Sequence, residues 1–356
     1  GGTSIMAIID KPSDYFNTKL YTGNGASSHA ITGVGFKPDW TWNKNRSSAV
    51  NHALTDVVRG APLRLVSNNN EAEINQTTGL LSFNSDGFTV GSDSGYNGNG
   101  NSMVSWNWKA GTSFSNSAGA NSATIASTGS VNTDAGFSIV SYTGNGSAGA
   151  TIFHGLGATP AMIIQKIRSS TGNWLVYHHK NTSAPETEFL RLNTANATAD
   201  EATIWNDTAP TSSVFSVGTE STINGSGNTC VAYCFAEKQG YSKFGSYVGN
   251  GNAKGPMIFT GFKPAWIMIK NAGSSSEEWN IWDNKRNTFN VMTTRLVANV
   301  NAADSVTSAG FFDFTSNGFK IRSTANGVNQ SGNTMIYMAF AENPFVAGNF
   351  NPATAR

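Results

Sequence analysis

Cysteine is scarce in this sequence, which argues against a fold held by disulfide bonds or by a cysteine-rich metal site. Only Cys230 and Cys234 are present among 356 residues, in one apolar run. Four residues apart on a strand, they would stand roughly 13 Å from each other, too far for a disulfide. A zinc site would need further ligands nearby, and the local sequence has none. We expect no structural disulfide, no metal and no cofactor.

Charge is also sparse and balanced. Charged residues make up 13% of the chain, and the formal net charge is +1, so no strong field attracts nucleic acid or an anionic membrane. There is no run of about 18 apolar residues and no visible signal peptide. We therefore expect neither nucleic-acid binding nor membrane insertion.

Glycine and aromatic residues are abundant instead. The chain has 38 Gly, 21 Phe, 9 Trp and 9 Tyr, with 38% hydrophobic residues overall. This composition favours strands and tight turns, and it supplies enough apolar material to exclude wholesale disorder. The length is too great for one ordinary core and suits two or three domains.

One pattern of spacing occurs three times along the chain. "YTGNG" stands at 21–25 and again at 142–146, and "YVGNG" follows at 247–251. A proline follows each tyrosine after 17, 18 and 17 residues, and further shared landmarks keep this register. These landmarks are a lysine (Lys44, Lys166, Lys270), an Arg-Leu pair (Arg64-Leu65, Arg191-Leu192, Arg295-Leu296) and a phenylalanine (Phe88, Phe215, Phe319). A repeat at this period indicates an array of similar units.

Short β-branched or aromatic runs bounded by Gly, Asn and Pro predict strands and turns within each unit. Recurrent Asn-Gly pairs, including those of the YTGNG motif, predict hairpin turns, because both residues tolerate positive φ. The predicted fold class is all-β, with three tandem antiparallel β-sandwich repeats of the jelly-roll type. The expected divisions are a tag remnant (1–5), repeat 1 (6–112), a linker with repeat 2 (113–240), and repeat 3 with a C-terminal tail (241–356).

The connections between the units differ in length and composition. Residues 111–136 are small and polar, so we expect a flexible first half and a second half that supplies the first strand of repeat 2. Only 238–246 separates repeats 2 and 3. We expect these two repeats to lie close together in a fixed relation.

No catalytic constellation is apparent. The motif lacks the Lys-Ser/Thr of a phosphate-binding loop, no G-x-S-x-G elbow is present, and the five histidines are scattered. We predict no enzyme, no catalytic residue and no metal site. Asp56 and Asp283 recur at equivalent places, with His178 in repeat 2. We expect them to pair with Arg64 and Arg295 and to fix strand register, and the alternative is a repeated anion or glycan site.

Aromatic residues that break the repeat are the best candidates for ligand binding. Trp40 and Trp266 align with each other, as do Trp174 and Trp279, and we assign all four to the core. The shared fold does not require the aromatic or imidazole groups that occur in one repeat only, and such groups stack on sugars and anchor interfaces. The candidates are Trp42, His52, Tyr96 and Trp205.

Several stretches resemble a known repeat domain of unknown function. "YTGNG…GVGFKPDW", "AGFSIVSYTGNG", "YCFAEKQGYSKFGSYVGNG" and "YMAFAENPF" are similar to sequences in structural proteins of marine tailed bacteriophages, commonly tail-fibre or other virion components. The resemblance covers Met6 to Arg356 and is weakest in repeat 1. It implies a virion-associated role and carries no established functional residues.

The expected function is that of a non-enzymatic virion structural protein, in the class of tail fibres or surface appendages. We expect it to be made in the host cytoplasm and to reside on the tail or capsid surface. The expected partners are other virion proteins, a host-surface glycan or receptor, and further copies in a homotrimer. Two alternatives stay open: a capsid-decorating or head-fibre protein, and a lectin-like glycan-active enzyme.

Overall fold

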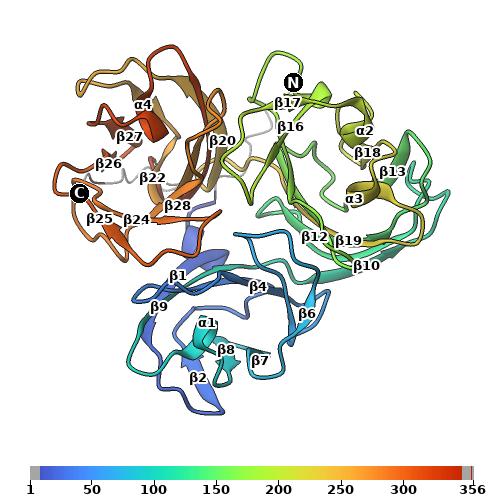
Figure 1. Ribbon diagram of the computed structural model, residues 1–356, viewed down its shortest axis with the longest axis horizontal. Coiled ribbons are helices and arrows are strands. Elements are labelled where there is room, and N and C mark those ends of the chain that lie inside the picture. Colours follow the sequence, from blue (N-terminus) through green and yellow to red (C-terminus); the bar gives the residue numbers. More distant parts are fainter. Residues whose placement is uncertain (1–8, 347–353, 355–356) are drawn as a thin grey trace.

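The computed structural model describes residues 9–346 and residue 354. The predicted tag remnant at 1–5 and most of the predicted tail lie outside these residues. The protein is nearly all-β with several antiparallel sheets, which confirms the predicted class. Figure 1 shows three lobes around a common centre, each from one third of the chain. We define lobe 1 as residues 9–110, lobe 2 as 111–237 and lobe 3 as 238–346.

Lobe 1 contains a larger and a smaller sheet. The larger has the order β1-β9-β3-β4, the smaller has the order β2-β8-β7, and β5 pairs with β6. The strands are β1 (Phe16–Thr22), β2 (His29–Thr32), β3 (Trp40–Asn45), β4 (Ala53–Asp56), β5 (Leu63–Arg64), β6 (Ile74–Asn75), β7 (Leu80–Asn84), β8 (Gly87–Val90) and β9 (Ser102–Trp108). The helices are η1 (Pro12–Asp14) and α1 (Ser94–Asn97).

Lobe 2 has an eight-stranded sheet, β10-β11-β12-β19-β14-β15-β16-β17, and the pair β13-β18. The strands are β10 (Thr112–Asn116), β11 (Ser127–Asn132), β12 (Phe137–Thr143), β13 (Ala150–Phe153), β14 (Met162–Ile167), β15 (Leu175–His178), β16 (Glu188–Arg191), β17 (Ala199–Asp200), β18 (Val214–Val217) and β19 (Thr229–Phe235). The helices are η2 (Pro185–Thr187), α2 (Ala202–Trp205) and α3 (Ser221–Asn224).

Lobe 3 has a six-stranded sheet, β20-β28-β22-β23-β24-β25, and a smaller sheet, β21-β27-β26. The strands are β20 (Ser242–Val248), β21 (Met257–Phe259), β22 (Phe262–Asn271), β23 (Asn280–Asp283), β24 (Thr294–Val297), β25 (Ser305–Val306), β26 (Phe312–Thr315), β27 (Gly318–Ile321) and β28 (Thr334–Pro344). The helix is α4 (Asn326–Asn329).

The same pairing recurs in the three larger sheets. The first strand (β1, β12 or β20) pairs with the last (β9, β19 or β28), which pairs on its other side with β3, β14 or β22. Lobe 2 differs because β10 and β11 continue its sheet beyond β12. The first half of the linker, expected to be flexible, instead contains β10, because its backbone pairs with β11.

The YTGNG motif connects two sheets and does not form the predicted hairpin turn. In lobe 2 its first two residues end β12, and its remaining residues lead to β13, which lies in the other sheet. The Tyr142 hydroxyl donates to the carbonyl of Ile223 at 2.8 Å, and the backbone N–H of Asn145 donates to Oδ1 of Asn224 at 3.0 Å. Equivalent bonds form in the other lobes. The motif therefore binds the short helix that precedes each last strand.

Glycine is required within the motif for two physical reasons. Gly146 has a φ of 75°, which side chains rarely adopt. A Cβ on Gly144 would stand 2.5 Å from the carbonyl oxygen of Gly225, so the two backbones could not approach as closely. The motif thus allows close backbone packing between loop and helix.

Apolar side chains from all three lobes meet at the centre of the molecule. The rings of Trp40 and Tyr233 stack across the contact of lobes 1 and 2, with centroids 4.2 Å apart. Trp108 meets Trp266 across lobes 1 and 3 at 5.7 Å. These residues belong to one continuous buried cluster, and each lobe also buries a cluster of its own. Because such aromatic burial is strongly favourable, the lobes are joined by a shared core.

Candidate functional site

All four residues predicted to bind a ligand lie inside the fold. The side chains of Trp42, His52, Tyr96 and Trp205 are each at most 3% exposed. Tyr96 pairs with the Thr55 hydroxyl at 2.7 Å, and Trp205 packs edge-on against another ring of lobe 2. The structure brings only Trp42 and His52 together. None of the four offers a surface to an external ligand in this conformation.

Trp42 and His52 form a buried hydrogen-bonded pair. Trp42 Nε1 donates to His52 Nδ1 at 2.9 Å, and His52 Nε2 lies 2.9 Å from the carbonyl oxygen of Val297 in lobe 3. Burial lowers the pKa of His52 to about 3. The imidazole is therefore neutral at pH 7, and its proton sits on Nε2, because Nδ1 accepts from Trp42.

The bond from His52 belongs to a ring of three equivalent contacts between lobes. Trp174 Nε1 in lobe 2 donates to the carbonyl of Val66 in lobe 1 at 2.8 Å. Trp279 Nε1 in lobe 3 donates to the carbonyl of Arg191 in lobe 2, also at 2.8 Å. His52 completes the cycle from lobe 1 to lobe 3. Trp174 and Trp279, two of the four tryptophans assigned to the core, thus also hold neighbouring lobes together.

The predicted ion pairs form with other arginines than expected. Asp56 binds Arg59 at 2.5 Å, three residues further along, and both side chains are fully buried. Arg64 instead lies 3.6 Å from Asp93. Asp56 also accepts a hydrogen bond from the Tyr233 hydroxyl of lobe 2 at 2.7 Å. The pair thus lies at the contact of lobes 1 and 2, because the residues after β4 turn back toward Asp56.

The contact between lobes 3 and 1 repeats this arrangement. Asp283 binds Arg286 at 2.6 Å and accepts from Trp106 Nε1 of lobe 1 at 3.0 Å. Burial opposes ionisation of Asp283, but the Arg286 charge and the hydrogen bonds outweigh it and lower the pKa of the carboxyl. Asp304 then bridges Arg286 and Arg46 of lobe 1 at 2.9 and 2.7 Å. Arg295, the expected partner, bonds to Asn280.

The contact between lobes 2 and 3 has neutral groups at the equivalent positions. His178 replaces the aspartate and lies with Nε2 3.0 Å from the carbonyl oxygen of Tyr337. Burial lowers the pKa of His178 to about 3, so it too is neutral. Where Asp304 meets Arg46, the corresponding backbone bond runs from Thr198 to Ala272 at 2.9 Å, between uncharged residues.

The recurrent lysines predicted as landmarks are buried. Nζ of Lys44, Lys166 and Lys270 donates to backbone carbonyls, for example from Lys270 to Ala195 of lobe 2 at 3.0 Å. Burial lowers the pKa of each to about 8. They therefore satisfy buried carbonyl groups, and Lys270 does so across the contact of lobes 2 and 3. The sequence spacing alone did not reveal this role.

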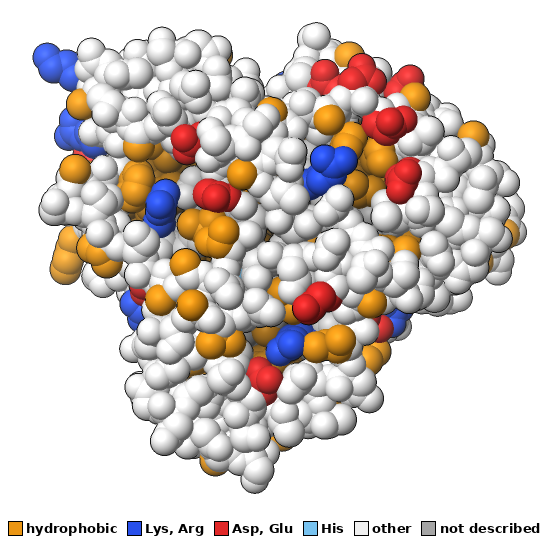
Figure 2. All heavy atoms as spheres, viewed as in Figure 1, with side chains coloured by type: hydrophobic (Ala, Val, Ile, Leu, Met, Phe, Trp, Pro, Cys, Tyr) orange, Lys and Arg blue, Asp and Glu red, His pale blue; other side chains and the backbone are white. Residues whose placement is uncertain are grey.

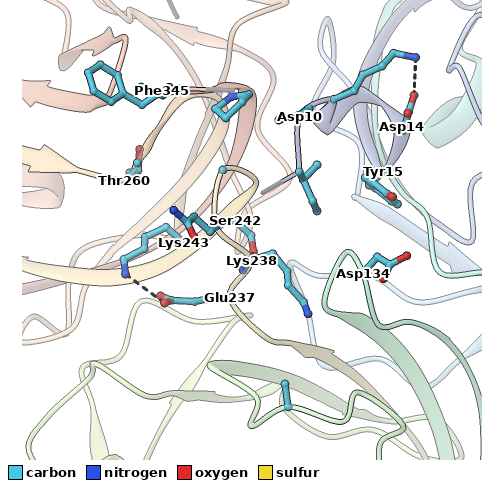
Figure 3. Close-up of a pocket in the computed structure, with 18 residues that line it drawn as sticks. Asp10, Asp14, Tyr15, Asp134, Glu237, Lys238, Ser242, Lys243, Thr260 and Phe345 are labelled. Carbon is cyan, nitrogen blue, oxygen red and sulfur yellow. Dashed lines mark hydrogen bonds and ion pairs between the residues drawn. The ribbon is translucent and has the colours of Figure 1, made fainter. Parts of the chain in front are cut away.

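A cavity of about 1220 Å³ opens where the three lobes meet. Figure 3 shows Tyr15, Asp14 and Asp134 on one side and Thr260, Lys243 and Glu237 on the other. Lys11 binds Asp14 at 2.7 Å, and Lys243 binds Glu237 at 3.2 Å. The sequence offered no signal for this cavity, because its walls come from separate segments spread along the chain from Ile9 to Val346.

The cavity combines carboxylates, ammonium groups and an aromatic ring. Burial opposes ionisation of Glu237, yet the hydrogen bonds from His179 and the Phe244 N–H, with the Lys243 charge, lower its pKa to about 2. The ring of Tyr15 packs edge-on against Tyr241 at 5.8 Å. Such groups can hydrogen-bond to a polar ligand and stack on it, as sugars require.

The face of the molecule in Figure 2 is mostly uncharged; Asp and Glu side chains gather at the top right, and Lys and Arg side chains occur singly, some of them close to Asp or Glu. Within the described residues, no group of three His, Cys, Asp or Glu side chains is placed to hold a metal ion. In the same part of the chain, no helix has the length and apolar character to cross a membrane.

Comparison with known proteins identifies a family and no characterised relative. A family model described as "Domain of unknown function (DUF7483)" matches residues 11–344. No curated protein matches the sequence, and no solved structure matches the fold.

Proposed function

The chain belongs to the DUF7483 family of domains of unknown function, and we propose that it is a non-enzymatic structural protein of a tailed-phage virion. The observation that carries the proposal is the closed ring of contacts from Trp174, Trp279 and His52. Residues at equivalent positions in three lobes are used to hold one rigid body together. A rigid body with near-neutral charge suits a component whose role is mechanical and adhesive.

We place the protein in the tail-fibre or surface-appendage class, on the sequence resemblance to phage structural proteins. We also interpret each lobe as a β-sandwich repeat of the jelly-roll type. Each lobe has a larger and a smaller sheet with an apolar cluster between them, as lobe 3 has between Ile267 and Phe319. Tail fibres usually have three-fold symmetry. Because one chain already has three similar lobes, a single copy can bind a partner with three-fold symmetry, and no homotrimer is needed.

Labelling of intact virions tests this proposal. Antibody raised against the purified chain, with gold detection in the electron microscope, is expected to mark the tail of a phage that encodes it. Antibody preadsorbed with the chain serves as the control. Label on the capsid would favour the capsid-decorating alternative, and absence of the chain from purified virions by mass spectrometry would contradict any virion role.

The central cavity supports a second element of the proposal, the binding of a host-surface glycan. The supporting observation is the combination of Tyr15, Asp14 and Asp134 on one wall of the cavity. On a glycan array, a glycan bound by the chain is expected to lose binding in Asp134→Ala. Asp313→Ala, remote from the cavity and paired with Arg322 on the outside of lobe 3, is the matched control. Turnover of the bound glycan would instead support the enzyme alternative.

A further inference from the structure

The departure of lobe 2 from the other lobes points to a docking surface on lobe 3. In lobe 2, residues 111–132 run along the edges of both sheets of the lobe. β11 pairs with β12, and Ile125 forms a parallel bridge with Ile152 of β13. Lobe 3 has no strand of its own at either equivalent place within the described residues.

The region that residues 111–132 cover in lobe 2 includes an aromatic side chain. Phe114 of β10 packs edge-on against Phe153 of β13, with ring centroids 5.5 Å apart. A Cβ on Gly155 would lie 3.2 Å from Phe114 and 3.5 Å from Val131. The segment thus fits closely over Phe153 and Gly155.

The strand registers identify the matching residues in lobe 3. Ile152 lies opposite Phe215, and Ile258 lies opposite Phe319, the phenylalanine at the same place in the repeat. Phe259 therefore corresponds to Phe153. By the same count, Gly261 corresponds to Gly155, and both have positive φ.

In lobe 3 no strand of the described residues covers this region. Phe259 is 66% exposed, and a Cβ on Gly261 would meet nothing within 4 Å. Gly261 opens onto the central cavity beside Thr260 and Phe345, which Figure 3 shows on the lobe 3 side. Lobe 1 has Thr32 at the position of the phenylalanine. An exposed aromatic at this place is therefore peculiar to lobe 3.

The backbone at the edge of β21 is also free to accept a strand. β21 pairs with β27 on one side only. The N–H and C=O groups of Met257 and Phe259 point away from β27 and have no hydrogen-bond partner among the described residues. In lobe 2 the equivalent groups of Thr151 bond to the Thr124 segment, for example Thr124 N–H to Thr151 O at 3.0 Å.

We propose that the edge of β21 with Phe259 and Gly261 docks an extended segment of a partner protein, made of small uncharged residues and one aromatic side chain. Lobe 2 supplies the template, since residues 111–132 contain no charged residue and one Phe. The docking surface matches this template in charge, because Met257, Phe259 and Gly261 are uncharged, as are residues 111–132. Main-chain pairing at a sheet edge supplies affinity, and the aromatic contact supplies specificity.

A peptide with the sequence of residues 111–132 is the probe, added to the full-length chain. Calorimetric titration is expected to give a Kd below about 1 mM, and hydrogen exchange is expected to slow at Met257–Phe259. Phe259→Ser is expected to weaken binding at least about tenfold, as for an aromatic anchor. Phe289→Ser is the matched control, because Phe289 is a 74% exposed phenylalanine elsewhere in lobe 3. Its Kd should stay within about twofold of the unchanged chain.

Four outcomes would overturn the proposal. The first is no binding of the peptide at about 1 mM, and the second is an equal loss of affinity in Phe259→Ser and Phe289→Ser. The third is slower hydrogen exchange at Ala150–Phe153, which would mean that the peptide displaces the chain's own segment. The fourth is unchanged affinity for a peptide that carries Phe114→Ser. Self-association of the chain that Phe259→Ser abolishes would identify a second copy as the occupant, against a partner protein. This inference goes beyond the proposed function, and its failure would leave the labelling test of the virion role unaffected.

Discussion

At the scale of single residues, Trp42 and His52 place the larger and the smaller side chain in the opposite order from the equivalent residues of the other lobes. Lobes 2 and 3 have an unbranched or branched apolar side chain on β14 or β22 (Ile164 or Met268), followed by a tryptophan (Trp174 or Trp279). Lobe 1 has the tryptophan on β3, as Trp42, and the smaller side chain after it, as His52. The Trp42–His52 hydrogen bond preserves the donor to the next lobe. Two residues that each break the repeat thus satisfy one structural requirement together.

This exchange predicts strong coupling between the two positions. His52→Trp alone overfills the core, and Trp42→Ile alone leaves a cavity and an unpaired Nδ1, so each is expected to cost about 2–4 kcal/mol. The double change recreates the residue pair of lobe 2, and its cost should be at least about 1 kcal/mol smaller than the sum of the two single costs. Urea unfolding of the four proteins measures the coupling, and strict additivity would contradict it.

The buried histidines predict loss of stability in acid. Burial lowers the pKa of His52 and His178 to about 3 and of His154 to about 4. A folded pKa below the unfolded value of about 6.5 means that the unfolded chain binds protons first as pH falls. Stability should therefore be greatest above pH 6.5 and fall between pH 6.5 and 4, by up to roughly 1.4 kcal/mol per pH unit for each histidine.

Urea midpoints measured from pH 7.5 to 4.5 test this dependence. His52→Gln removes one titrating group and should flatten the curve, although it lowers the plateau. A curve of unchanged steepness would show that the histidine does not titrate on unfolding in this range.

At the scale of elements, the three contacts between lobes differ in charge. Those of lobe 1 with lobes 2 and 3 each contain a fully buried Asp-Arg pair, whereas that of lobes 2 and 3 has the neutral His178 at the equivalent position and a partly exposed pair, Lys243–Glu237. The contact of lobes 2 and 3 joins the two lobes with the shortest linker in the sequence. The contact of lobes 3 and 1 has no connecting segment within the described residues, so its ion pairs hold two lobes that the chain does not join directly.

Removal of one partner of such a pair should be costly. Asp283→Asn removes the fully buried carboxylate that binds Arg286 and leaves the guanidinium with Asp304 as its one charge partner, and it is expected to destabilise the protein by about 3–5 kcal/mol. Asp313→Asn breaks a pair with Arg322, whose side chain is 52% exposed, and should cost at most about 1 kcal/mol. Chemical unfolding compares the two, and similar small losses would show that the buried pair contributes little.

Local sequence patterns predicted the strands well, and the contacts between distant segments poorly. The aligned Arg-Leu pairs illustrate the limit: Leu190, and not Leu192, lies opposite Val176, as Leu296 lies opposite Ile281. This two-residue shift leaves the spacing almost unchanged and keeps the leucine on the same face of the strand, so the alternating pattern of the sequence does not reveal it. Likewise, the burial of Tyr96 depends on a Thr55 hydroxyl 41 residues away. Composition and spacing do not report which distant surfaces meet.

At the scale of the whole molecule, the shared core makes one chain resemble an assembly of three subunits. Phe235 and Phe340 from two lobes lie 6.0 Å apart near the centre, within the cluster that also contains the tryptophans of lobe 1. In an oligomer, such a core forms only on association. Here the linkers keep the three lobes at high effective concentration, so the core forms within a single chain.

The purified chain is therefore expected to be a monomer of 37.6 kDa. Light scattering coupled to size exclusion measures this mass directly, at several concentrations. A stable mass three times larger would instead support the homotrimer expected from the resemblance to phage fibres.

The central cavity also brings together the two ends of the described chain. Ile9 and Val346 both line it, so a short connection could join the two ends without crossing a lobe. The order of the lobes along the polypeptide then depends on where the chain termini lie in an otherwise closed ring of lobes. Opened within the linker between lobes 1 and 2 and joined across the cavity, a circularly permuted chain would preserve every contact between the lobes.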